Sequence, residues 1–175
     1  MEGWTQMKKY CRPYRIYKPR KDKGGAASAF QIVSYLNHKD KERLVVFLEM
    51  ANQIKTDDDS DKFHWNNKEM AVTVQLDDPD ISELILVLIG AKEGAGYLKD
   101  GKWSGLYHNN PKGNTVINLS SAKNGGFILG VSSRRDNQTV RVSHLISQAE
   151  AVILLEVFRA YFARKYATVI YKKDV

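Results

Sequence analysis

The order of the strand-like and helix-like segments is what most constrains the fold of this chain. Four runs of apolar or alternating residues come first, at positions 14–18, 26–36, 44–51 and 70–76, and polar turns separate them. A helical pattern follows, with Asp78 as the expected N-cap, Pro79 at the first helical position and Gly90 closing the segment. The first half of the chain is therefore predicted to form four strands and one amphipathic helix.

The second half repeats this order. Strand-like runs occupy positions 105–109, 115–121, 125–133 and 139–145, with turns expected at 123–126 and 136–137. Ser147 and Glu150 have the spacing of a capping box, which begins a helical run to about Ile170. A shift of 69 residues places Asp78 on Ser147, so the two expected N-caps coincide. Two ββββα units predict an α+β fold, with two four-stranded antiparallel sheets packed together and a long C-terminal helix.

The length allows a single domain with its own core. A chain of 175 residues buries roughly 70% of its unfolded surface. We expect a basic N-terminal arm at 1–13, one domain at 14–170 and a C-terminal tail at 171–175. Cys11 is the only cysteine, which excludes an internal disulfide. Without an apolar run long enough for a membrane span or a secretory signal, we expect an intracellular protein with no membrane partner; the sequence does not distinguish cytoplasm or nucleoid, nucleus and organelle.

Positive charge is concentrated near the N-terminus. Residues 1–23 hold eight Lys or Arg and two acidic residues, which is +6 of a total net charge of +7. Tyr10, Tyr14 and Tyr17 are interleaved with these cations. Basic residues mixed with aromatic ones are typical of a surface for a polyanion, nucleic acid first, and a solvated basic tail is the alternative.

Catalytic and metal-binding motifs are not found in the sequence. His38, His64, His108 and His144 each lack a second ligand at metal-binding spacing. The acidic run at 57–61 resembles the start of a calcium loop, but lysines occupy the positions that need Gly and a bidentate Glu. We therefore expect no enzyme activity, no metal and no cofactor, although folding can bring distant catalytic groups together.

The second helical run is apolar on more than one face. Its apolar residues are Val152, Ile153, Leu154, Leu155, Val157, Phe158, Ala160, Tyr161 and Phe162. A monomer would leave part of this surface in water. The pattern predicts a homo-oligomer, and a single larger core is the alternative.

Strand alternation divides the side chains between two faces. Along the second run, Ala26, Ser28, Phe30 and Ile32 share one side, and Ala27, Gln31, Val33 and Tyr35 share the other. Aromatic residues on a solvated face can stack unpaired bases. The candidates are Tyr17, Phe30, Phe47 and Trp65, although the first interpretation of each one taken singly is a core residue.

Several strings of residues resemble, in order, those of the Whirly proteins. The strings are Lys23-Gly24-Gly25-Ala26-Ala27, Val45-Val46-Phe47-Leu48-Glu49, Phe63-His64-Trp65-Asn66-Asn67-Lys68-Glu69, Asp80-Ile81-Ser82-Glu83-Leu84, Leu106-Tyr107-His108-Asn109-Asn110-Pro111-Lys112-Gly113, and the run from 139 to 158. The resemblance covers about residues 14 to 170. It extends to the positive-cofactor-four-like single-stranded DNA binders and the kinetoplastid guide-RNA-binding proteins.

This resemblance implies two roughly perpendicular four-stranded sheets, helices that build a tetramer, and binding of single strands without sequence specificity on sheet edges and faces. The family's Lys-Gly-Lys-Ala-Ala motif, which is tied to DNA binding and higher assembly, corresponds to residues 23–27. The second lysine of that motif is replaced by Gly25 in this chain.

We therefore expect a single-stranded DNA-binding protein that acts in replication, recombination, repair or transcription. Two alternatives remain open: an RNA-binding chaperone or matchmaker on the same fold, since stacking alone does not distinguish ribose from deoxyribose, and a module that does not bind nucleic acid. Trp65 beside Lys68 is the principal stacking candidate. The residues expected to bind phosphates are Lys18, Arg20, Lys21 and Lys23, and Arg134, Arg135 and Arg141 extend the path unless they serve only to solvate a hairpin tip.

Overall fold

The structure of the chain is a computed structural model. It describes residues 8–9, 12–22, 24–36, 41–55, 62–67, 69–110, 113–123, 125–135 and 138–170. The elements are β1 (Lys8–Lys9), β2 (Tyr14–Lys18), β3 (Ala26–Leu36), β4 (Glu42–Asn52), β5 (Ala71–Leu76), α1 (Asp78–Leu88), β6 (Leu98–Lys99), β7 (Lys102–Trp103), β8 (Leu106–Asn110), β9 (Gly113–Ser121), β10 (Phe127–Arg135), β11 (Gln138–Ile146) and α2 (Gln148–Ile170).

The first sheet, sheet 1, is antiparallel and four strands wide. β3 pairs with β4, and β4 pairs with β5. β1 and β2 both pair with the other edge of β3, opposite residues 33–34 and 26–30. Lys8 and Lys9, which the sequence places in the basic arm, therefore contribute to the sheet.

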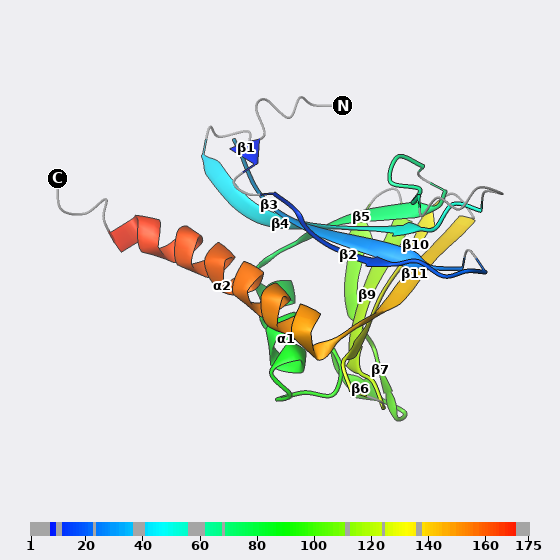
Figure 1. The fold of residues 1–175 in the computed structure, drawn as a ribbon. Coiled ribbons are helices and arrows are strands. Elements are labelled where there is room, and N and C mark those ends of the chain that lie inside the picture. The colour runs from blue at the N-terminus through cyan, green and yellow to red at the C-terminus, as the bar shows by residue number, and fades with distance from the viewer. Residues whose placement is uncertain are drawn as a thin grey trace.

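The second sheet, sheet 2, has the order β11-β10-β9-β8, and all its pairs are antiparallel. The two sheets cross steeply, with sheet 1 above sheet 2 in Figure 1. Where they meet, the side-chain amide of Asn52 on β4 donates to the carbonyl oxygen of Arg141 on β11 at 3.3 Å. The predicted α+β architecture, with its long C-terminal helix, is confirmed.

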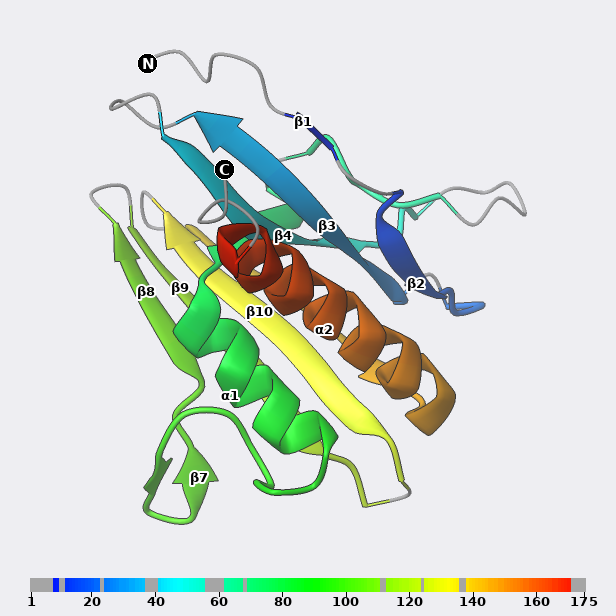
Figure 2. The ribbon, with the colours of Figure 1, turned by 90° about the vertical axis from the view of Figure 1, so that its left-hand side faces the viewer.

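Figure 2 shows the two helices packed against the sheets. The buried side chains of both sheets and both helices form one continuous core. Phe30 on β3 is 1% exposed, and its ring lies edge-on to Phe158 of α2 with centroids 5.8 Å apart. Leu48, Ile117 and Leu84 join the same cluster from β4, β9 and α1. Interpreting Phe30 as a stacking platform was therefore wrong, because its face of β3 is the one that packs against the helices.

The start of α1 differs by one residue from the sequence prediction. Asp77, not Asp78, is the N-cap: its carboxylate accepts from the Asp80 backbone at 3.2 Å, and the Asp80 carboxylate accepts from the Asp77 backbone at 3.0 Å. Pro79 lies in the first turn as expected. Because Asp78 is not the cap, its carboxylate can accept hydrogen bonds from the Tyr161 hydroxyl and the Lys165 ammonium of α2, both at 2.6 Å.

The N-caps correct the offset of the internal repeat. Asp77 and Ser147 are 147 − 77 = 70 residues apart, so the repeat is 70 residues and not 69. With this shift the buried helix positions coincide: Ile81, Leu84 and Leu88 of α1 correspond to Ala151, Leu154 and Phe158 of α2. The two helices therefore dock through equivalent positions.

Residues 97–104 form a small β-hairpin, β6–β7, which the sequence analysis did not predict. No helix in the described part of the chain is long and apolar enough to cross a membrane.

Candidate nucleic-acid interface

A row of small residues crosses the outer face of sheet 1, the face turned away from the helices. The register aligns Tyr17 of β2 with Ala27 of β3, Ala51 of β4 and Ala71 of β5. Ile16 is buried in the core, so the alternation of side chains turns Tyr17 outward. The three alanines leave room above the sheet for side chains from elsewhere.

The loop after β4 fills this room with two aromatic rings. Phe63 and Trp65 pack over Ala27, Ala51 and Ala71 as a small cluster separate from the main core. The Tyr17 ring lies 5.5 Å from that of Phe63 and 6.3 Å, edge-on, from that of Trp65. We call Tyr17, Phe63 and Trp65 the aromatic patch.

The aromatic patch opens to solvent. Tyr17 is 47% exposed and Trp65 is half-buried, whereas Phe63 lies beneath them with 8% of its surface exposed. Together with Ile54 and Lys62 they line an open hollow of about 590 Å³. An open, apolar hollow of this kind has the shape and chemistry to hold the face of an unpaired base.

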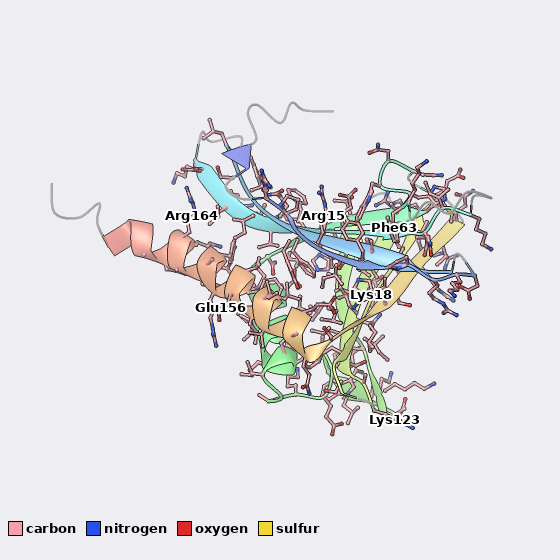
Figure 3. The ribbon with its side chains drawn as sticks, viewed as in Figure 1. Arg15, Lys18, Phe63, Lys123, Glu156 and Arg164 are labelled. Carbon is pink, nitrogen blue, oxygen red and sulfur yellow. The ribbon has the colours of Figure 1, made fainter. Side chains whose placement is uncertain are left out.

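Cations lie around the aromatic patch. Arg15, two residues before Tyr17, is exposed on the same face of β2. Figure 3 shows Arg15 and Phe63 on the side of sheet 1 away from α2 and Lys18 on the side toward it. Arg20 and Lys21 are exposed in the turn that follows β2, and Arg20 pairs with Asp22 at 2.7 Å.

Lys18 points toward the inside of the molecule. Its ammonium lies 2.7 Å from the carboxylate of Glu150, the residue whose backbone N–H is capped by Ser147 at the start of α2. Burial opposes ionisation of Glu150, but the hydrogen bonds from Lys18 and Ser147 outweigh it and lower the pKa of this carboxyl group. The capping box predicted for Ser147 and Glu150 is confirmed, and Lys18 is held at the base of α2, away from the outer face.

The turn between β2 and β3 is held by one glutamine. The side-chain oxygen of Gln53 accepts hydrogen bonds from the Arg20 backbone at 2.9 Å and the Gly25 backbone at 3.1 Å. A Cβ atom on Gly25 would lie 2.3 Å from the carbonyl oxygen of Lys18. Gly25 is therefore explained by close approach to its own chain.

The remaining predicted residues that the structure describes lie apart from the aromatic patch. Phe47 is half-buried on the outer face of sheet 1. Arg134 and Arg141 are exposed on the outer face of sheet 2, whereas Arg135 is half-buried at the end of β10. Lys23 and Lys68 lie outside the described residues.

Two histidines have structural surroundings. His108 on β8 lies 3.1 Å from the buried carboxylate of Asp80 on α1. His144 is buried on β11, and burial lowers its pKa. Within the described ranges, no three His, Cys, Asp or Glu side chains are grouped as metal ligands.

Sequence reasoning missed Phe63, Arg15 and Lys62 as members of this site. A signal was present for one of them: Arg15 lies two residues before Tyr17 in the same strand-like run, so alternation places both on one side. Phe63 lies in the loop after β4, where alternation does not apply. Lys62 carries no such signal.

Solved structures with this fold differ widely from the chain in sequence. WHY3 from Arabidopsis thaliana is 14% identical over 88% of each chain, with a TM-score of 0.60. The plant transcriptional regulator PBF-2 is 15% identical over 93% of this chain and 87% of its own, with a TM-score of 0.61. A guide-RNA-binding protein complex bound to a guide RNA is 16% identical over 89% and 91%, with a TM-score of 0.53. No family model and no curated protein matches the sequence. The chain therefore has the Whirly-like fold.

Proposed function

We propose that this protein binds single-stranded nucleic acid, DNA first, without sequence specificity. The observation that carries the proposal is the aromatic patch: two partly exposed rings above a third, in an open hollow, with Arg15 on the same face. Every base has a π-face, so stacking on such rings tolerates any sequence. Processes that expose single strands, namely replication, recombination, repair and transcription, are the setting in which we place this activity.

Arginine and lysine around the aromatic patch would supply the second part of the affinity. Each phosphate neutralised on a single strand releases counterions and adds about 0.7 to the slope of log affinity against log salt. Arg15, Arg20 and Lys21 are the exposed cations on β2 and in its following turn. Duplex DNA hides the faces of its bases, so this arrangement favours single strands.

RNA is the second candidate ligand. Its support is the fold shared with a protein complex whose structure contains a guide RNA. Stacking does not read the 2′-hydroxyl group, so the aromatic patch by itself would accept both nucleic acids.

We also propose that the protein assembles through α2, as a tetramer by its resemblance to the Whirly proteins. Val152 and Ile153 are 59% and 50% exposed on this helix, while Leu154 beside them is buried. Ile153→Asp should reduce the mass measured by light scattering at micromolar concentration to that of a monomer. Ile128→Asp makes the same change at an exposed site on sheet 2, and an equal effect there would contradict assembly through α2.

The function is tested by fluorescence anisotropy with a labelled mixed-sequence 30-mer as single-stranded DNA, RNA and duplex DNA across a salt series. Tight single-strand binding with little duplex binding is the expected result, and the ratio of DNA to RNA affinity decides between the two ligands. Equal, weak binding to all three with a steep salt slope would refute the proposal, because only nonspecific charge would then be acting.

A further inference from the structure

The β6–β7 hairpin is an insertion in the edge of sheet 2. The backbone of Ala95 pairs with Leu119 of β9 before the hairpin, and Leu106 pairs with Ile117 after it. The Gly105 N–H donates to the carbonyl of Ala95 and closes the base. In Figure 1 the hairpin lies at the end of the molecule opposite sheet 1, and Figure 2 shows it beyond the end of the sheet where β8 begins.

The base of the hairpin is firmly anchored. The Lys92 ammonium lies 2.5 Å from the Glu83 carboxylate of α1, donates to the Gly96 carbonyl at 2.7 Å, and sits 5.3 Å from the centre of the Trp103 ring. A Cβ atom on Gly94 would overlap the Trp103 ring at 2.3 Å. An isolated ribbon of two residue pairs is marginal in water, so these contacts are what hold its shape.

The tip of the hairpin, in contrast, carries two like charges opposite each other. Asp100 and Gly101 have positive φ angles of 49° and 73° and form the tight turn. Lys99 and Lys102 are therefore directly opposite each other, and like charges in this position destabilise a hairpin. Neither ammonium forms an ion pair with a residue that the structure describes.

Alternation along the ribbon adds an aromatic ring to this charged face. Leu98 faces the same side as Trp103, so Tyr97 shares the other side with Lys99 and Lys102. Tyr97 is 67% exposed. We propose that this face, formed by Tyr97, Lys99 and Lys102, is a second contact for the same nucleic-acid strand, with Tyr97 stacking a base and the two lysines neutralising phosphates. The inference rests on the proposed function and extends the bound strand beyond sheet 1.

The test measures binding of the labelled single-stranded 30-mer to the full chain. Lys99→Gln/Lys102→Gln should lower the salt slope by about 1.4, which is about 0.7 for each contact. The same variant should unfold at an equal or higher temperature, because it removes the like-charge pair. Lys99→Arg/Lys102→Arg keeps both charges and is the matched control, which should keep the slope of the wild type; an equal fall in slope there would overturn the inference.

Stacking is tested on the two faces of the ribbon. Tyr97→Ser should weaken binding roughly 5-fold or more, whereas Leu98→Ser, on the opposite face and 59% exposed, should bind as the wild type does. Equal losses in both variants would overturn the face-specific contact. So would hairpin variants that bind DNA normally but lose affinity for a polyglutamate peptide, which would make an acidic protein the partner. If the wild type binds no single-stranded DNA or RNA, the proposed function itself fails. If the wild type binds and the hairpin variants bind with the same affinity and salt slope, this inference alone fails.

Discussion

The outer face of sheet 1 carries clustered aromatic rings above a row of alanines. The outer face of sheet 2 carries small polar side chains, two arginines and the exposed aliphatic pair Ile128 and Leu145. On sheet 2, Asn118, Thr139 and Ser143 are exposed, and Tyr107 stands alone without a neighbouring ring in the described residues. Both faces follow from the same strand alternation. The difference teaches that an aromatic platform needs small residues on the neighbouring strands, because these give loop rings a place to lie.

The contrast between the two outer faces requires that the aromatic patch contribute little to the stability of the fold. Phe30→Ala empties a fully buried site and should lower the free energy of unfolding by about 3–5 kcal/mol. Tyr17→Ala removes a half-exposed ring and should cost far less. Urea denaturation of both variants measures this, and similar losses would mean that the aromatic patch is part of the structural core.

Trp65→Ala should give the largest loss of binding without loss of fold. Losing a stacked base costs about 1–3 kcal/mol, or roughly 5- to 150-fold in affinity. Tyr107→Ala is the matched change on sheet 2 and should leave single-strand affinity unchanged. Anisotropy with the 30-mer compares them, and an equal loss in the Tyr107 variant would remove the distinction between the two faces.

Substitution of Arg134 and of Arg141 tests whether sheet 2 contributes to nucleic-acid binding through charge alone. Each Arg→Gln substitution should reduce the salt slope by about 0.7 if its guanidinium contacts a phosphate, with the same change for every base composition tested. A slope equal to that of the wild type would limit the interface to sheet 1. A loss that varies with sequence would instead indicate base contacts.

The smallest expected effect concerns the junction of the two sheets, where His144 lies near Lys18 and Glu150. Burial holds the pKa of His144 below its ordinary value of 6.5, although a hydrogen bond to the Leu145 carbonyl opposes this. As the pH falls below about 6.5, the unfolded chain takes up a proton on His144 that the folded chain does not. The contribution of neutral His144 to the free energy of unfolding is therefore complete above that pH and is lost as the pH falls toward the lower pKa of the folded state.

Thermal unfolding at pH 7.5 and 5.5 tests whether stability falls on acidification because of His144. The wild type should lose more stability on acidification than His144→Gln, which has no proton to take up. Glu150 and Asp78 have lowered pKa values, because hydrogen bonds from Lys18 and from Lys165 and Tyr161 outweigh their burial, and their contribution is lost only at still lower pH. Identical pH responses of the two proteins would exclude His144 as the cause.

Much of the fold was predictable because it is written in local patterns. Alternation placed the long strands and divided β3 into its two faces, and the capping box located the start of α2. Which face of β3 met solvent was not predictable, because Phe30 is buried by residues distant in the sequence, among them Phe158, 128 residues later. Asp77 and Asp78 are chemically identical, so the N-cap was resolved only by geometry.

The site was less predictable than the fold. The position of Phe63 depends on where the loop after β4 lies above the sheet, which no periodicity encodes. In the sequence, Lys18 does not differ from the other cations of the basic segment. Only the fold brings it to Glu150, which lies 132 residues later. The β6–β7 hairpin did carry an Asp-Gly turn signal, but its strands are only two residues long and carry little alternation.

Neighbouring residues of β2 face opposite ways, and this joins two properties of the molecule. Tyr17 belongs to the aromatic patch, while Lys18 grips Glu150 in the first turn of α2, the helix that exposes Val152 and Ile153. A nucleic acid that shifts β2 on binding would also shift α2 and change the affinity of one protomer for another. By reciprocity, assembly through α2 would then change the affinity for the nucleic acid by the same factor. The concentration of the protein would then act as an effector of its own binding.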